Sequence, residues 1–363
     1  MSIALINLPS ILLIILTTYV GYRYLFLHGL KPYIFNFIFF YHLFFIVIFF
    51  IYAQTNDSDS IKHFTDGQEN VILRSFFNFG SNFIRVISSF FIQTFNVNYF
   101  SLNLLFGSFG TLGLLFLANL IQKKMLRNKF LFYILLMILF VPSLNFFTSS
   151  TGKDSLMFLF SCLLVWSLDD YNNSKIPLIL LSIFLMMLTR LYIAIPTSVI
   201  VIFFFPLIIE NKFSRNFYII YYVIFLIFMI LVAYFLSEIL TQAGIINKGT
   251  GTVNGELNFD YFYQRMNVQS TTLSFAKSGF KDIHNNYLLY YFKYTFGPFL
   301  LDTQKGFKFF FTKIESLFYF SMILSIILFT GMSYNKKSLF CKNIMFLMIF
   351  LSITIPLSLS ISN

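Results

Sequence analysis

Chemically active side chains occupy a few short segments between long apolar runs, and the most compact of these segments is 142–154. A helix that begins near Asp154 presents unpaired backbone N–H groups, and Lys153 adds a positive charge beside them. The hydroxyl of Ser150 is a further polar group in this segment. The combination is typical of a phosphate-binding site. The alternative is an ordinary helix cap in a short loop, because Asp and Ser are favoured at helix starts for local reasons.

Arg190 interrupts an otherwise apolar stretch, and no acidic residue is adjacent to it. An arginine near a membrane is costly unless it is paired, so such a residue usually marks a functional site or a salt bridge. Its guanidinium is suited to grip a pyrophosphate through two hydrogen bonds. The alternative is an arginine at a loop tip that extends its head group to the membrane surface.

An acidic segment begins at Asp57 and includes Asp59 and His63. The last two residues are four positions apart and would share one face of a helix. Either side chain is a candidate base that removes a proton from an acceptor hydroxyl. A solvated polar loop explains the same residues, and no recognised metal-ligand spacing is present.

A second candidate base, His284, lies on a long polar region and follows Arg265. Histidine titrates near neutral pH and is therefore suited to proton transfer, and the arginine would add positive charge toward an anionic substrate. The alternative for His284 is a solvent-exposed loop residue without a role in chemistry.

The composition places these segments in a lipid environment. Of the 363 residues, 58% are hydrophobic, 11% are charged and 54 are phenylalanine, whereas roughly a quarter of the residues in a soluble domain are charged. The net charge of +11 does not indicate nucleic-acid binding, because Lys and Arg fall between apolar runs rather than in one basic domain. Anionic lipid head groups and phosphates are the expected partners.

We therefore expect an all-α, polytopic integral membrane protein that forms a single domain over residues 1–363. A membrane helix needs about 20 mostly apolar residues. The apolar run 176–209 would be roughly 50 Å long as one helix, so we divide it at Arg190 into a hairpin. The alternative is a single broken helix, which would place every later loop on the opposite side of the membrane. The ten predicted spans, two of them short, are 5–21, 33–52, 100–120, 130–147, 155–168, 176–189, 191–209, 217–236, 312–330 and 344–360.

Basic residues in the short loops predict the orientation of these spans. The strongest cytoplasmic marker is the lysine- and arginine-rich loop 122–129. The ten-span arrangement then places four polar segments together on the external side: 53–99, 148–154, Arg190 and 237–311. Within the first, residues 71–95 mix apolar and basic side chains, as a helix lying on the membrane surface does. No glycine-rich nucleotide loop is present, and no cofactor or metal is expected.

The motif His284-Asn-Asn-Tyr-Leu288 is similar to an element of the bacterial O-antigen ligases and polymerases. In architecture the whole chain resembles the repeat-unit polymerases (Wzy-type) of O-antigen and capsule synthesis. The acidic first external loop followed by a surface helix also resembles the GT-C glycosyltransferases, in which an Asp of that loop is the base. Segments 142–154 and 190–192 resemble a broader set of polysaccharide-cluster membrane proteins.

These resemblances imply a polymerase that joins oligosaccharides carried on undecaprenyl pyrophosphate, at the periplasmic face of the bacterial inner membrane. Arg190, Lys153 and Arg265 would hold the pyrophosphate, with Ser150, Asp154 and Asp57 in support. The base would be His284, or Asp59 with His63. A chain-length regulator and a flippase of the same pathway are candidate partners. The alternatives are a GT-C transferase with a polyprenyl-phosphate sugar donor and a flippase of lipid-linked oligosaccharides.

Overall fold

The computed structural model describes residues 8–27, 29–55, 58–68, 80–125, 136–137, 139–169 and 173–208, together with positions 221, 223, 252–253, 256–257, 344–345 and 348. This part of the chain is helical apart from one pair of two-residue strands. The chain divides into two compact units, Met1–Ala194 and Ile195–Asn363. The single membrane domain expected from the sequence stays a prediction.

The helices follow the predicted spans closely at their starts and ends in most of the described part. Strands β1 (Thr252–Val253) and β2 (Glu256–Leu257) pair antiparallel, with Thr252 opposite Leu257. The elements are α1 (Leu8–Leu25), α2 (Pro32–Thr55), α3 (Asp59–Gln68), α4 (Ser81–Phe95), α5 (Tyr99–Met125), α7 (Pro142–Thr148), α8 (Lys153–Asp169), the 3-10 turn η1 (Asn173–Lys175), α9 (Ile176–Thr189), α10 (Leu191–Ile208), β1 (Thr252–Val253) and β2 (Glu256–Leu257).

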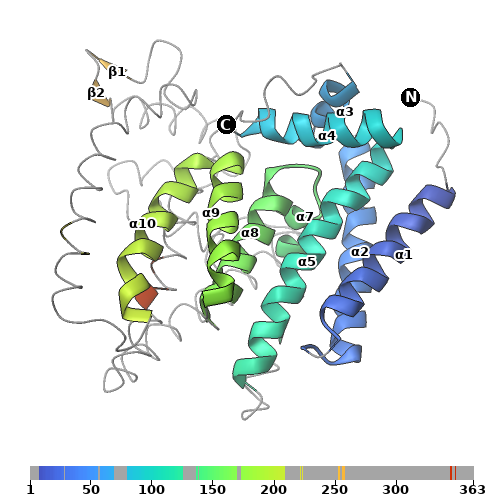
Figure 1. Ribbon diagram of the computed structural model, residues 1–363. Coiled ribbons are helices and arrows are strands. Elements are labelled where there is room, and N and C mark those ends of the chain that lie inside the picture. Colours follow the sequence, from blue (N-terminus) through green and yellow to red (C-terminus); the bar gives the residue numbers. More distant parts are fainter. Residues whose placement is uncertain are drawn as a thin grey trace, which may run out of the picture. The chain divides into compact units, whose positions relative to one another are not determined.

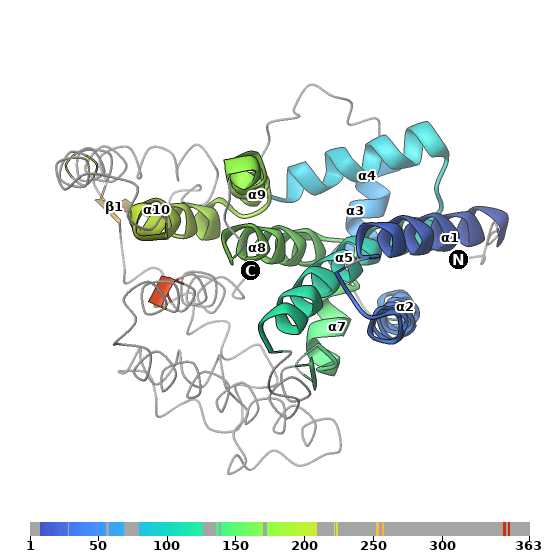
Figure 2. The ribbon, with the colours of Figure 1, turned by 60° about the horizontal axis from the view of Figure 1, so that its bottom comes forward.

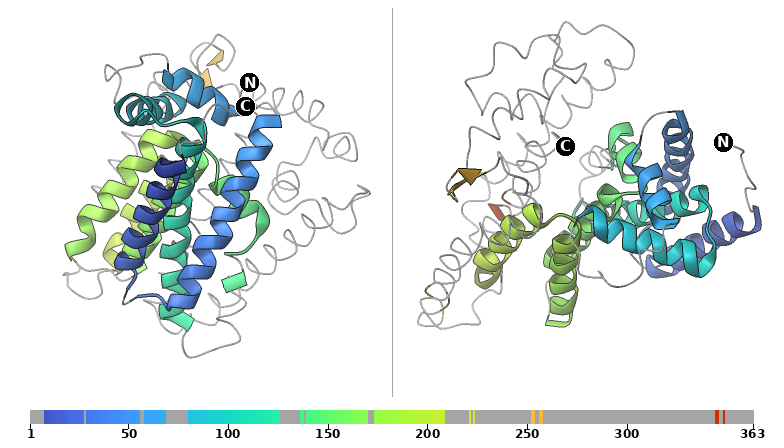
Figure 3. Two further views of the ribbon diagram at one scale, coloured as in Figure 1. Left: turned by 90° about the vertical axis from the view of Figure 1, so that its right-hand side faces the viewer. Right: turned by 90° about the horizontal axis from the view of Figure 1, so that it is seen from above.

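Helix α5 is the centre of the first unit, where it contacts α1, α2, α7 and α8. Figure 1 shows α3 and α4 lying across one end of this bundle, and the left view of Figure 3 shows the same arrangement from the side. The hydroxyls of Ser60 on α3 and Tyr99 at the start of α5 form a hydrogen bond of 2.7 Å. The two short helices therefore cover the end of the bundle at which α5 begins.

Two helices of the described part are long and apolar enough to cross a membrane: α2, with 24 residues, and the stretch Tyr99–Lys123 of α5, with 25 residues. Helices satisfy all their backbone hydrogen bonds internally, which is the requirement that a lipid interior imposes. The expected break at Arg190 is confirmed, because α9 ends at Thr189 and α10 begins at Leu191. Predicted spans 217–236, 312–330 and 344–360 lie almost entirely outside the described residues.

The expected continuous span 130–147 is wrong over its described part. Val141 has extended backbone angles (φ −61°, ψ 121°), and a new short helix, α7, begins at Pro142. Proline has no N–H to continue the preceding helix, and it disfavours helical angles in the residue before it. The side chain of Asn145 donates to the carbonyls of Leu139 and Val141, at 2.7 and 2.9 Å, and so satisfies the interrupted backbone. Figure 2 shows α7 close to α2 and α5.

Gly110 of α5 allows the close approach of the segment that follows α7. A Cβ atom at this position would lie 2.2 Å from the carbonyl oxygen of Thr148 and 3.0 Å from Nε2 of His42. Backbone occupies the space, so a side chain here forces α5 and α7 apart.

We expect Gly110→Ala to lower the free energy of unfolding by about 1–3 kcal/mol, the usual cost of overpacking. Gly21→Ala on α1 is the matched control, because a Cβ there meets nothing within 4 Å. Alanine in that helix should be neutral or stabilise by roughly 0.5–1 kcal/mol. The measurement is thermal unfolding of the purified protein in detergent, and equal midpoints for the two variants would contradict the close packing at Gly110.

Candidate functional site

Polar residues from three distant parts of the chain meet at the end of the bundle that α3 and α4 cover. They come from α3, from the start of α8 and from the end of α9 (Figure 1). The charge of Lys153 acts on His63, and the charge of Arg190 acts on Lys153. The sequence predicts these three segments on one side of the membrane, and the structure brings them together in space.

Lys153 is the first residue of α8 and is partly buried. Burial lowers the pKa of its ammonium group, and the nearby charge of Arg190 lowers it further, while Asp154 and Asp59 oppose the shift. Among the described residues no carboxylate forms an ion pair with Lys153, because those nearby pair with other cations. The lysine is therefore a partly desolvated cation at which an anionic ligand would be stabilised.

Arg190 caps the C-terminal end of α9, where its backbone N–H donates to Met186 at 2.8 Å. Its side chain is only 12% exposed and forms an ion pair with Asp154. No acidic residue is adjacent to Arg190 in sequence, but α8 supplies this partner from 36 positions earlier. The pair joins the start of α8 to the end of α9. Asp154 also neutralises much of the positive charge of Arg190 that we expected, from the sequence, to bind a pyrophosphate.

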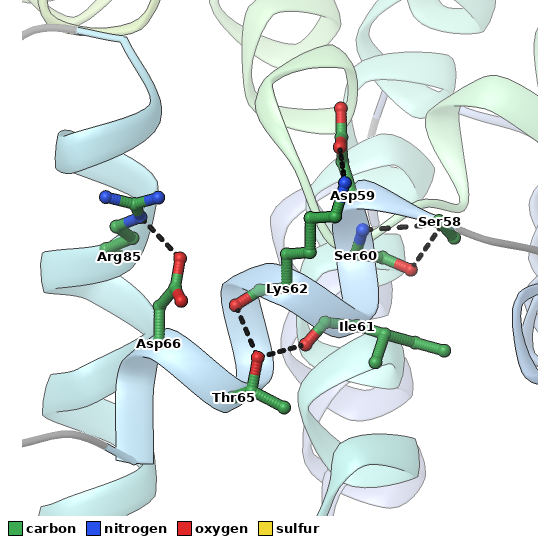
Figure 4. A network of polar contacts seen from close by, with 8 residues as sticks. All are labelled: Ser58, Asp59, Ser60, Ile61, Lys62, Thr65, Asp66 and Arg85. Carbon is green, nitrogen blue, oxygen red and sulfur yellow. Dashed lines mark hydrogen bonds and ion pairs between the residues drawn. The ribbon is translucent and has the colours of Figure 1, made fainter.

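Helices α3 and α4 are joined by a second ion pair, in which Nε of Arg85 lies 2.7 Å from a carboxylate oxygen of Asp66. Asp59 lies 3.7 Å from the ammonium of Lys62 on its own helix. Figure 4 shows both pairs, with Asp66 facing α4. The side chain of Asp59 is 84% exposed, so water solvates its carboxylate, whereas the less exposed Asp66–Arg85 pair connects the two helices.

His63 lies on the covered side of α3 and is only 7% exposed. Its Nδ1 atom is buried and has no hydrogen-bond partner among the described residues. Burial lowers the pKa of His63 to about 4, and the charges of Lys153 and Arg85 act in the same direction. The imidazole is thus neutral at physiological pH, with a nitrogen able to accept a proton.

The hydroxyls before α8 donate to groups within the protein, and those of Ser149 and Thr151 are buried. Ser150 donates to the carbonyl of Phe147 at 2.8 Å, and Thr151 donates to the side chain of Asn103 at 3.1 Å. Ser149 donates to the carbonyl of Asn145 at 2.6 Å. These hydrogen bonds stabilise the loop, and in this conformation the three hydroxyl groups are not available to donate to a phosphate.

His42 is a buried polar residue that the sequence argument missed. It is fully buried on α2, with Nδ1 3.0 Å from the side-chain oxygen of Asn145 and Nε2 3.5 Å from the hydroxyl of Ser149. These contacts hold the segment that leads into Lys153. The available signal was a lone histidine in the apolar run 33–52, since ionisable groups inside membrane helices are usually functional or structural necessities.

Arg85 and Gly80 were also missed as site residues, because they belong to α4 and its N-cap, and the sequence predicted α4 only as a surface helix. The predicted residues Asp57, Arg265 and His284 lie outside the described part of the chain. No group of three or more His, Cys, Asp or Glu side chains in the described part is arranged to hold a metal ion.

In comparisons with known proteins, the chain matches no family model, no curated protein and no solved structure. The assignment of a function therefore depends on the sequence and on the geometry of this site.

We expect the stability of the protein to fall as the pH is lowered from about 6.5 toward 4. The folded-state pKa of His63, about 4, is below its ordinary value of 6.5. In this interval the unfolded chain takes up a proton that the folded chain does not, and below it this group adds no further loss. In thermal unfolding, His63→Asn should lose less stability than the wild type between about pH 7 and pH 5. The same pH dependence in both proteins would contradict the burial of a neutral His63.

We also expect Arg190 and Asp154 to be energetically coupled. Arg190→Gln and Asp154→Asn should each destabilise the protein, and the double variant should be more stable than the sum predicts by roughly 1 kcal/mol. Thermal unfolding of the four proteins in a double-mutant cycle measures the coupling. Strict additivity would show that the ion pair does not contribute in solution.

Proposed function

We propose that this protein is a polytopic membrane glycosyltransferase that polymerises oligosaccharide repeat units carried on undecaprenyl pyrophosphate, in O-antigen or capsular polysaccharide synthesis. We place it in the bacterial inner membrane with ten spans and with the polar end of the bundle on the periplasmic side.

The distribution of polar and apolar side chains supports a lipid environment. The exposed side chains of α2 include Phe37, Phe40 and Phe44, each more than half exposed. The interior between α2, α5 and α7 instead holds His42 and Asn145, which are fully buried. An apolar exterior around a polar interior is costly in water and is expected where the surrounding solvent is hydrocarbon.

The observation that carries the catalytic part of the proposal is Lys153. It is a partly buried ammonium group, at the N-terminus of a helix, without an ion-pair partner among the described carboxylates. Such a site favours an anion, and the phosphates of a lipid carrier are the anions available at a membrane surface. An amphipathic helix such as α4 is expected to lie at the depth of lipid head groups.

In the proposed reaction, the acceptor sugar hydroxyl attacks the anomeric carbon of the donor as the bond to the carrier's pyrophosphate breaks. The pyrophosphate leaves with the bonding electrons, and Lys153, with Arg190 beside it, stabilises its charge. The hydroxyl proton passes to the buried nitrogen of His63. A bound pyrophosphate would offset the charge of Lys153 and so raise the pKa of His63, which makes the imidazole a better base when substrate is present.

A second candidate is a GT-C transferase that adds one sugar from a polyprenyl-phosphate donor. Asp59 favours it, because this exposed carboxylate lies at the start of α3 on the polar segment that leads into α4. In that reaction the carboxylate of Asp59 takes the place of His63 as the base. For the polymerase, His284 is the alternative base to His63, and Arg265 is a further residue proposed to bind the anion.

Deleting the gene in its host and complementing it with variants tests the proposal on a surface-polysaccharide gel. We expect deletion to reduce the ladder to a single repeat unit, and Lys153→Ala to complement at least about tenfold less well, the effect of losing one charge-stabilising contact. Lys153→Arg is the matched control that keeps the charge and should restore part of the ladder. Immunoblotting of a tagged protein checks that the variants reach equal levels.

A full ladder from Lys153→Ala would overturn the assignment of the anion site. If deletion removes even the single repeat unit, and complementation requires Asp59, the result favours the GT-C transferase. Comparing His63→Ala with His284→Ala identifies the base of the polymerase, because only the variant without the base should lose the ladder at equal protein levels.

A further inference from the structure

The start of α4 lies directly beside Lys153. Gly80, the residue before α4, has φ 71° and ψ −126°, a conformation that glycine adopts readily and other residues rarely. A Cβ atom at Gly80 would lie 3.8 Å from Nζ of Lys153. The backbone N–H of Gly80 donates to the carbonyl of Leu188 at 2.8 Å, which anchors this turn against the end of α9.

The first turn of α4 has no side-chain cap. Most helices begin with a Ser, Thr, Asp or Asn whose oxygen accepts from the first N–H groups, but Gly80 has no side chain and no side-chain hydrogen bond caps this end. Helix α8 also begins here, at Lys153 itself. Two helices therefore direct the positive ends of their dipoles toward the same region, with an ammonium group between them.

The same region contains an unsatisfied buried polar atom. His63 is more than nine-tenths buried, and its Nδ1 has no hydrogen-bond partner among the described residues. Lys153 is the charged residue that affects this histidine most strongly. The uncapped N–H groups of α4 and the ammonium group of Lys153 both favour an anion with several acceptor oxygens.

We propose that the first turn of α4, residues 81–83, together with Lys153, forms the cradle for the pyrophosphate of the lipid-linked donor. The inference rests on the proposed function and adds to the site helix α4, which the sequence predicted only as a helix on the membrane surface. The backbone N–H groups of α4 bind the phosphate oxygens, Lys153 neutralises their charge, and the absence of a side chain at Gly80 leaves room for the ligand.

Asn82, in this first turn, offers a substitution that separates binding from folding. It is exposed, and its side-chain oxygen lies 3.3 Å from Nη1 of Arg85, which donates to it. An acidic residue in the first turn of a helix interacts favourably with the helix dipole and with Arg85. It repels an anion bound at the same N–H groups. A purely structural role for this turn therefore predicts that Asn82→Asp is harmless or stabilising, whereas the cradle predicts a loss of binding.

The experiment measures binding of inorganic pyrophosphate to the purified full-length protein in detergent by calorimetry, with thermal unfolding of each variant alongside. We expect Asn82→Asp to weaken binding by about tenfold or more, as a like charge close to the ligand does, with an unchanged or higher midpoint. Gln93→Glu, near the other end of α4, adds the same charge and should bind within about twofold of the wild type, because the added charge is distant from the ligand. Lys153→Ala should lose binding.

The outcomes separate this inference from the proposed function. Wild-type affinity in Asn82→Asp, together with loss of binding in Lys153→Ala, overturns the α4 cradle and leaves the polymerase proposal in place. Wild-type affinity in Lys153→Ala, or no binding by the wild type, overturns both. A short-chain prenyl pyrophosphate identifies the source of the ligand: tighter binding than inorganic pyrophosphate supports a lipid-linked donor, and equal binding overturns that part of the inference.

Discussion

The ion pair between Arg190 and Asp154 is the interaction on which the polar end of the bundle depends. Arg190 ends α9 with its side chain largely buried, and an unpaired guanidinium there would carry a large desolvation cost. Asp154 removes that cost and in doing so fixes the start of α8 against the end of α9. The neighbouring residue, Lys153, is thereby positioned, but it does not pair with the adjacent Asp154, because that carboxylate pairs with Arg190.

A second constraint acts below this pair, inside the bundle. The segment between α7 and α8 enters the interior as irregular backbone, and buried polar groups there are costly unless they are hydrogen-bonded. The side chains here are hydrogen-bonded: Asn145 to His42 and to the carbonyl of Leu139, Ser149 to the carbonyl of Asn145, and Thr151 to Asn103. The hydroxyls of this segment therefore form hydrogen bonds within the protein. The groups that remain for ligand binding are charged side chains and backbone N–H groups at the polar end of the bundle.

The electrostatics of the site couple its two proposed roles. Lys153 makes His63 harder to protonate, and Arg190 makes Lys153 harder to protonate. An anion bound among them reverses both effects, because it stabilises each positive charge. Binding of the leaving group and activation of the base are then parts of one equilibrium, a property that follows from the closeness of the three residues.

The sequence by itself determined much of the local structure. Apolar runs predicted helices α1, α2, α5, α8, α9 and α10, the lone Arg190 predicted the break between the last two, and the cluster at Lys153 predicted where α8 begins. Basic loops predicted that α3, the start of α8 and Arg190 belong on one side. These features are encoded in neighbouring residues, through periodicity, helix-ending signals and the cost of charge in apolar surroundings.

Only the tertiary structure decided which of these groups are engaged. It paired Arg190 with Asp154 and Asp66 with Arg85, directed the hydroxyls of Ser149 and Thr151 inward, and brought Gly80 beside Lys153. It also buried His63 while leaving Asp59 in water, although both lie on one short helix. Each outcome depends on contacts between segments far apart in the chain. The physical reason is that a side chain's charge state and free hydrogen-bonding capacity are determined by the partners that packing provides, and residue type and spacing do not specify those partners.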